Sequence, residues 1–192
     1  MIIKDGKQYV RVSTIAKRFN NYGYAPEAKM QNKSRIGTNV HEAIDCYLKN
    51  DVPILTNDDE IGYFNSFLIW RKEVAIDIVC REKRYFNDEL MVTGKVDGVA
   101  MIPGEKSPIL IDYKCAAKEM ESWRIQTHLY YILATKTGMR LGNRVLVIQL
   151  SEKGDPPKAF SYLISDNNLA KCYLAIDAYH KAHKLSHRSR SV

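Results

Sequence analysis

The hydrophobic residues of the chain follow a helical period in some segments and a strand-like period in others. In residues 34–49 an apolar side chain recurs at every fourth position, which predicts a helix. A second helix is expected to begin at the run 57–60, because its acidic side chains suit the positive end of a helix dipole. Two more helices are predicted over residues 118–136 and from about residue 166 to residue 184.

Five other segments have the composition and spacing of β-strands. They are residues 76–86, 90–102, 108–114, 144–150 and 158–164. Short polar or Pro/Gly-rich turns separate the first three, so we expect these to form an antiparallel meander. The order of the elements predicts an α/β (α+β) fold in which a central mixed β-sheet is flanked by helices.

The predicted elements form a single domain, residues 1–185. It begins with a hairpin that turns at Asp5-Gly6, a favoured two-residue turn, and continues into a short helix that Ser13 or Thr14 caps. The N-terminal hairpin, helix and basic loop, the core, and a flexible basic tail are expected at residues 1–33, 34–185 and 186–192.

Composition narrows the class of protein. The chain has 192 residues, of which 45% are hydrophobic, so it can fill a core of ordinary size and is not expected to be disordered. No segment approaches the ~18 consecutive apolar residues of a membrane span. The first residues resemble neither a signal peptide nor a transit peptide. We therefore expect a cytoplasmic protein without a membrane partner.

Cysteine usage and net charge narrow the class of protein further. The four cysteines, Cys46, Cys80, Cys115 and Cys172, include no C-x-x-C pair, so neither a zinc ribbon nor an iron–sulfur cluster is expected. The 29 Lys and Arg residues outnumber the 22 Asp and Glu residues, which gives a formal net charge of +7. This excess of positive charge favours a polyanionic partner.

The strongest chemical signal lies in the predicted meander. Asp112 and Lys114 are two residues apart on a strand, so they project from the same face, ~7 Å apart. If the preceding turn is centred between Glu105 and Lys106, Asp97 lies opposite Lys114 and diagonal to Asp112. Two carboxylates on one face suit Mg²⁺ or Mn²⁺, and an adjacent ammonium can orient a water that attacks phosphorus. The alternative is a structural ion pair on a half-exposed sheet.

Further candidates lie on the predicted helices. His41 follows Gly37 by one turn on the same helix face, where the glycine would let another backbone approach closely. A lone helical histidine is more often a surface or core residue than a ligand. Gln126 and Tyr130 share a face of the helix that follows Lys114, which brings them near the carboxylates.

Basic side chains gather in two places. One group, interleaved with aromatic residues, leads into the helix that carries His41 and includes Lys33 and Arg35. Such a mixture can hold phosphates and stack unpaired bases, although a solvated loop is the alternative. The second group lies near the C-terminus and contains three histidines, which on their own would suggest a metal-binding tract. Its lysines and arginines favour a basic arm attracted to DNA instead.

Four short motifs occur in order along the chain: Gly37-x-x-x-His41, Gly94-x-x-Asp97, Asp112-x-Lys114 and Gln126-x-x-x-Tyr130. Their order and structural context resemble the RecB-type branch of the PD-(D/E)XK nucleases. The resemblance covers about residues 9–131 and is nearest to phage and mitochondrial-maintenance-like single-chain exonucleases. Val96 stands where the superfamily name has proline, and the chain lacks the cysteine group that holds an iron–sulfur cluster in some relatives.

The resemblance implies a restriction-endonuclease-like core and assigns roles around one Mg²⁺ or Mn²⁺ ion. Asp97 and Asp112 match the metal-binding carboxylates of the family, and the main-chain carbonyl of Tyr113 is a further ligand. His41 matches the additional metal ligand of this branch. Lys114 matches the catalytic lysine.

Three more residues receive roles by the same resemblance. Gln126 and Tyr130 match the motif that supports the active site and contacts the nucleic-acid strand. Glu82 is a candidate for the acidic residue on the first strand of the meander. Its placement depends on the turn: four residues at 87–90 put Glu82 on the face of Asp97, whereas three residues do not.

The resemblance implies a metal-dependent DNA exonuclease that hydrolyses phosphodiester bonds in phage or bacterial-type recombination, repair or replication. Its expected partners are single- or double-stranded DNA ends and a recombination or replication protein. One alternative is a structure-specific endonuclease with the same site. Another is a catalytically inert DNA-binding subunit, but no matched catalytic position is substituted.

Overall fold

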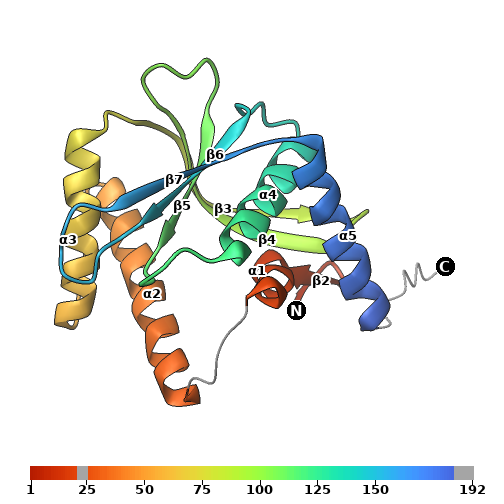
Figure 1. Cartoon of the computed structure of the whole chain (residues 1–192), viewed down its shortest axis with the longest axis horizontal. Helices are drawn as coiled ribbons and strands as arrows, with labels where there is room; N and C mark the ends of the chain where they lie inside the picture. The colour runs from red at the N-terminus through yellow and green to blue at the C-terminus, as the bar shows by residue number, and fades with distance from the viewer. Residues whose placement is uncertain (21–25, 184–192) are drawn as a thin grey trace.

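The computed structural model describes residues 1–20 and 26–183 as helices packed on both faces of a seven-stranded mixed sheet (Figure 1). The strands are β1 (Ile2–Lys4), β2 (Lys7–Arg11), β3 (Asp77–Asn87), β4 (Val92–Met101), β5 (Ile109–Lys114), β6 (Arg144–Gln149) and β7 (Lys158–Leu163). The helices are α1 (Val12–Ala16), α2 (Glu27–Leu48), α3 (Asp58–Glu73), α4 (Glu121–Lys136) and α5 (Asp166–Ala182). The predicted mixed α/β sheet with an antiparallel meander is confirmed.

Two separate cores hold the helices to the sheet. One buries α1, α4 and α5 against one face, around Leu110, Leu129 and Leu133, and the other buries α2 and α3 against the opposite face, around Phe67, Ile111 and Tyr113. Figure 1 shows these two groups of helices on either side of the sheet. Because strand residues alternate between faces, Tyr113 packs under α3 while its neighbours in β5 face α4.

Local sequence accounts for most element boundaries. The hairpin of β1 and β2 turns at Asp5 and Gly6, whose positive φ angles of 50° and 72° suit a tight two-residue turn. Asn57 caps α3 by accepting the Glu60 backbone N–H, and Ser165 caps α5 in the same way. The helix predicted after the hairpin begins at Val12, so neither Ser13 nor Thr14 caps it.

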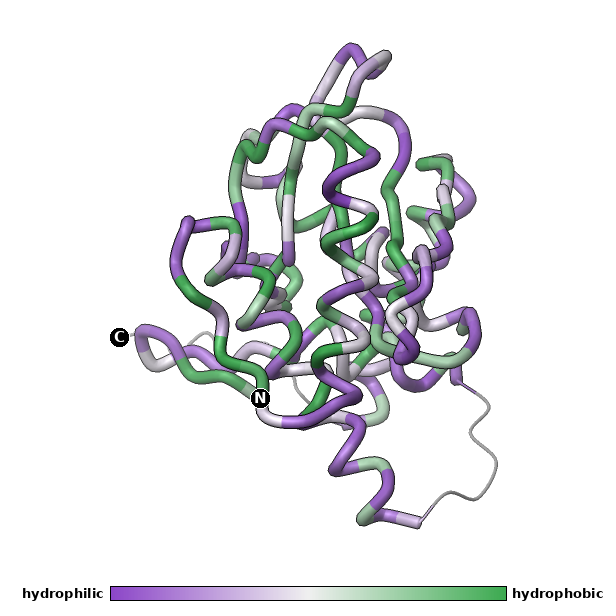
Figure 2. Tube along the Cα trace, turned by 90° about the vertical axis from the view of Figure 1, so that its left-hand side faces the viewer, coloured by the Kyte–Doolittle hydropathy of each residue, from purple (hydrophilic) through white to green (hydrophobic). Residues whose placement is uncertain are grey.

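One predicted loop is wrong over part of its length. Residues 27–33 belong to α2, which begins seven residues earlier than the periodicity indicates. These turns are exposed and largely hydrophilic, and they project from the body of the molecule (Figure 2). They bury no apolar stripe, but Ala, Glu, Lys, Met and Gln favour helix intrinsically. The predicted basic tail, residues 186–192, lies outside the described residues, and no helix within them has the length and apolarity that a membrane crossing requires.

The predicted register of the meander is also wrong, by two residues. β4 and β5 pair at Gly98–Ile111, Val99–Leu110 and Ala100–Ile109, so continuation of the ladder places Asp97 opposite Asp112 rather than opposite Lys114. The connecting segment is too long for its sequence to fix the centre of the turn. A shift of two residues does not by itself move a side chain to the other face, because the strand period is two. At Asp97, however, the alternation of β4 is interrupted, since Val96 packs in the core with α4 and Gly98 faces Ile111 in the core with α2.

Candidate active site

The candidate site lies beside the edge of β4 that pairs first with β2 and then with β5. Along one edge β4 pairs with β3; along the other it pairs with β2 at residues 92–93 and with β5 at residues 98–100. A cavity of about 280 Å³ opens beside the stretch between these two pairings. Its walls include Asp97, Asp112, Lys114 and His41, so the fold brings together residues from β4, β5 and α2.

Asp112 and Lys114 form the floor of the cavity. Asp112 is 1% exposed, and its Oδ2 lies 2.7 Å from Lys114 Nζ. Oδ2 therefore has an ion-pair partner, although the contact lacks the geometry of a hydrogen bond. Within residues 1–20 and 26–183, Oδ1 has no hydrogen-bond partner. A buried carboxylate oxygen without a donor is costly in a folded protein. Asp112 is therefore placed to accept a further cation.

Asp97 links the two strands in place of a ladder hydrogen bond. The Tyr113 N–H donates to Asp97 Oδ2 at 2.9 Å. The N–H and C=O of one extended residue point to the same edge of a strand, so the Tyr113 carbonyl is directed to the same gap. Asp97 Oδ1 lies 3.2 Å from His41 Nδ1 on α2. Asp97 thus stands between the histidine and the end of β5.

Glu82 lies beside Asp97 and His41. The turn between β3 and β4 has four residues, 88–91, one position later than the expected 87–90. Turn length alone does not place Glu82, since the alternation of β3 breaks there: Arg81 contacts α2, and Lys83 pairs with Val96 of the core on the α4 side. Ligand atoms of His41, Glu82 and Asp97 lie within 4.8 Å of one another. Glu82 has a φ of 48°, a left-handed conformation that non-glycine residues seldom adopt, and its carboxylate pairs with Lys95. Such backbone strain is commonly found at functional sites.

Burial and neighbouring charges push the two aspartates in opposite directions. Burial, helped by the Asp97 charge, raises the pKa of Asp112 to about 6, although Lys114 opposes the shift. Burial acts on Asp97 as well, but the charge and hydrogen bond of His41, with Lys114 and the Tyr113 N–H, hold its pKa below the usual range. Burial disfavours protonated His41, yet the Asp97 charge raises its pKa. Separated carboxyl pKa values are common at catalytic sites.

A chain of hydrogen bonds holds Lys114 in place. Lys114 Nζ donates to Gln126 Oε1 at 3.1 Å, and Gln126 Nε2 donates to the Tyr130 hydroxyl at 2.8 Å. The Tyr130 ring packs on Gly94, where an added Cβ would lie 2.6 Å from Tyr130 Cε1. The glycine, the tyrosine and the glutamine therefore form one support for the lysine. Gly37, in contrast, has nothing within 4 Å of an added Cβ, so among residues 1–20 and 26–183 no other backbone makes the close approach that was expected there.

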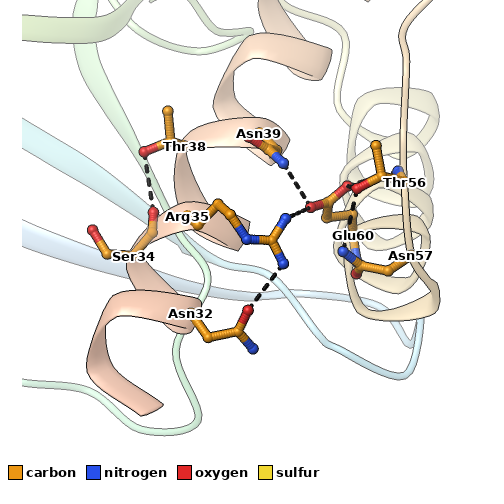
Figure 3. A network of polar contacts seen from close by, with 8 residues as sticks. All are labelled: Asn32, Ser34, Arg35, Thr38, Asn39, Thr56, Asn57 and Glu60. Carbon is orange, nitrogen blue, oxygen red and sulfur yellow. Dashed lines mark hydrogen bonds and ion pairs between the residues drawn. The ribbon is translucent and has the colours of Figure 1, made fainter. Parts of the chain in front are cut away.

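The two predicted DNA contacts on α2 lie apart from the carboxylates. Lys33 is exposed in the projecting turns of the helix. Arg35 belongs to a polar network between α2 and α3 (Figure 3), where its guanidinium donates to Asn32 and to the fully buried Glu60. Burial raises the pKa of Glu60, but hydrogen bonds from Thr56, Asn39 and Asn57 outweigh it, so the net pKa is below the usual range.

Three basic residues on the cavity wall were not predicted. Arg11, Arg84 and Lys95 are exposed and line the opening. Arg84 and Lys95 are directly paired across β3 and β4, and like charges in that position repel each other. Glu82 offsets part of this repulsion through its ion pair with Lys95, and a bound anion would relieve the rest. In the sequence, the signal is that two basic residues flank one hairpin turn. It shows that these residues are neighbours only when the register of β3 and β4 is known.

The donor set fits a hard divalent cation. It consists of two sets that overlap at His41 and Asp97: Glu82 places a ligand atom within 4.8 Å of both, and Asp112 lines the cavity of about 280 Å³ with both. Glu82 does not line that cavity but a second, smaller hollow, which Tyr113 also lines. Mg²⁺ and Mn²⁺ favour oxygen ligands with few nitrogens, whereas structural zinc sites normally use cysteine or several histidines. The Asp112 oxygen without a donor is the observation of this structure that a cation would satisfy.

No family model matches the sequence, and no curated protein does either. Among solved structures, the chain is similar to SSO0001, with a TM-score of 0.45 and 10% identity over 100% of this chain and 82% of that one. It is also similar to LHK-Exo in complex with dAMP, with a TM-score of 0.41 and 14% identity over 93% and 95% of the two chains. A candidate exonuclease from Eubacterium rectale gives a TM-score of 0.51 and 11% identity, over 95% of this chain and 85% of that one. This last similarity shows that the two proteins share the same mixed α/β fold.

Proposed function

We propose that this protein is a Mg²⁺- or Mn²⁺-dependent DNA exonuclease that hydrolyses phosphodiester bonds in phage or bacterial DNA recombination, repair or replication. The observation that carries the proposal is the buried Asp112 carboxylate, whose Oδ1 lacks a donor, beside Asp97 and Lys114 in an open cavity. The four motifs that resemble RecB-type PD-(D/E)XK nucleases supply these residues. The fold shared with a candidate exonuclease agrees with this function.

The proposed metal ligands are Asp97, Asp112, Glu82, His41 and the Tyr113 carbonyl. A divalent ion held there would neutralise the negative charge that develops on the phosphate during hydrolysis. The protein fixes the ligands in advance: the Tyr113 N–H holds Asp97, and Asp97 in turn orients the imidazole.

Lys114 is the proposed partner of the attacking water. Its ammonium has three donors, and Asp112 and Gln126 engage it from two sides. A donor that remains can hold a water molecule or a phosphate oxygen in the cavity. The support from Gln126 and Tyr130 limits the movement of the lysine, which keeps the nucleophile aligned with the phosphorus.

The proposed DNA contacts lie around the same opening. Arg11, Arg84 and Lys95 carry positive charge on the wall of the cavity, opposite the buried carboxylates. They are placed to bind phosphates that flank the scissile bond. Lys33, on the projecting turns of α2, would contact the DNA strand at a point further from the site. Affinity for DNA should therefore fall steeply as salt concentration rises.

The decisive experiment follows cleavage of end-labelled oligonucleotides with Mg²⁺ or Mn²⁺. Asp112→Ala and Lys114→Ala should each reduce the rate by about 10³-fold or more while retaining the fold and most DNA binding. Lys106→Ala is the matched control, since Lys106 is an exposed lysine in the turn at the other end of β5. Undiminished cleavage by both site variants would refute the proposal. A closed circular substrate should resist digestion, because an exonuclease needs an end.

A further inference from the structure

An ion pair joins α2 to β3 beside the proposed metal ligands. Arg81 Nε lies 2.9 Å from Asp45 Oδ1, and these two atoms are out of contact with solvent. The side chains are 34% and 15% exposed, respectively. Asp45 also pairs with Lys49, one turn further along α2, at 2.6 Å. The Asp45 carboxylate is therefore engaged by cations from two elements.

The position of this pair relative to the ligands is specific. Asp45 follows His41 by one helical turn, so both side chains lie on one face of α2. Arg81 immediately precedes Glu82 in β3. All four residues, with Asp97, line one small hollow between the helix and the sheet. The ion pair thus connects the helix position that carries one ligand to the strand position that carries another.

Both connected ligands need an external constraint. Glu82 has a left-handed backbone, which persists only where surrounding contacts hold it. His41 lies on a helix that Asn39 and Arg35 tie to Glu60 of α3, and His41 itself contacts Asp97 of β4. Among these polar contacts of α2, the one with Arg81 is the contact that sets the helix against β3, the strand that carries Glu82.

We propose that Asp45 and Arg81 are positioning residues, which hold His41 and Glu82 at the separation that metal binding requires. This inference rests on the proposed metal site. Neither residue contacts the metal or the DNA in this role. The competing role for Arg81 is direct contact with a DNA phosphate, which would depend on Arg81 alone and not on Asp45.

The test measures Mn²⁺ affinity by titration calorimetry on DNA-free protein. Asp45→Asn and Arg81→Gln should each weaken Mn²⁺ binding by about tenfold or more, the range found when residues that orient metal ligands are removed. The double variant should be no weaker than either single variant, because both remove the same contact. Arg81→Lys, which keeps the charge, should recover most of the affinity. Lys49→Gln is the matched control and should leave Mn²⁺ affinity unchanged, since it removes the other ion pair of the same aspartate.

Thermal unfolding without metal separates positioning from simple stabilisation. A lower unfolding midpoint with unchanged Mn²⁺ affinity in Asp45→Asn and Arg81→Gln would overturn the inference. Loss of DNA affinity in Arg81→Gln but not in Asp45→Asn, with Mn²⁺ binding intact in both, would overturn it in favour of phosphate contact. A wild-type protein that binds no Mn²⁺ would refute the proposed function itself, so the two failures are distinguishable.

Discussion

Gly94→Ala tests whether the support of Lys114 depends on close packing. An added Cβ at Gly94 would lie 2.6 Å from Tyr130 Cε1, whereas ordinary carbon–carbon contacts are ~3.5–4.0 Å. The Tyr130 ring must therefore retreat by about 1 Å. Gly94 has no positive φ, so the expected effect is steric and not conformational.

The retreat has two expected costs. Overpacking of a buried ring lowers the free energy of unfolding by about 1–3 kcal/mol. The Tyr130 hydroxyl holds Gln126, and Gln126 holds Lys114, so the displacement passes to the ammonium. A misplacement of about 1 Å in a catalytic group can lower the rate about 100-fold. Cleavage should therefore fall by much more than the loss of folded protein explains.

Gly98→Ala is the matched control. Gly98 lies in the same strand, but an added Cβ there would have Ile111 Cβ as its nearest atom, at 4.0 Å. Denaturant unfolding and single-turnover cleavage should show near wild-type values for this variant. In a Tyr130→Leu background, Gly94→Ala should cost less additional stability, because the clashing ring is absent and the contact with Val12 Cγ2, at 3.0 Å, is the one that remains of those described. Equal stability and equal cleavage of Gly94→Ala and Gly98→Ala would show that the packing argument is wrong.

Four other predictions follow from contacts described above. Glu60→Gln should lower the free energy of unfolding by about 3 kcal/mol at pH 7, since donors on both carboxylate oxygens lose a charged acceptor. The pKa of Glu60 is lowered on folding, so this stabilisation is complete above its unfolded pKa and is lost as pH falls through the folded pKa. The midpoints of urea titrations of the wild type and Glu60→Gln should therefore approach each other as the pH falls below about 4.3, the pKa of an unperturbed glutamate. Gly62→Ala places a Cβ 1.8 Å from the Glu152 carbonyl oxygen and should destabilise the protein by about 3 kcal/mol, measured by the same titrations. Gly37→Ala should stabilise α2 by up to about 1 kcal/mol, and a simultaneous loss of DNA affinity would place DNA at this glycine. Mn²⁺ at 100 times its Kd should stabilise the wild type by about 2.7 kcal/mol in thermal denaturation, and EDTA or Asp97→Asn should remove the effect.

The features that the sequence predicts well are those fixed by short segments. The hairpin turn at Asp5-Gly6 and the start of a helix at residues 57–60 depend on a few neighbouring residues, and both occur as predicted. The alternation of Asp112 and Lys114 likewise places both on one face whatever the register. For Asp97 the same argument fails, because the alternation of β4 is interrupted there: Val96 packs in the core with α4, whereas Gly98 faces Ile111 in the core with α2.

Long-range and conformational features could not be predicted in the same way. The partners of Arg35 depend on how α2 crosses α3, which no local pattern encodes. The left-handed φ of Glu82 is a tertiary effect at a position where a non-glycine residue normally extends a strand. Lys95 and Arg84 become neighbours only through the register of the hairpin. Each of these needs the assembled sheet before its position has chemical meaning.

The place of the cavity follows from how β4 divides one of its edges. β2 leaves that edge after residue 93 because α1 begins at Val12 and turns the chain away, and β5 joins only at Gly98. Between them the strand lacks a ladder partner on that side, yet buried backbone groups need hydrogen bonds. β5 loses its ladder with β4 beyond Ile111 in the same way, and there the Asp97 side chain meets part of the need by accepting the Tyr113 N–H. A polar residue at the break in pairing therefore has a structural reason, and the cavity that carries the proposed function opens beside the same break.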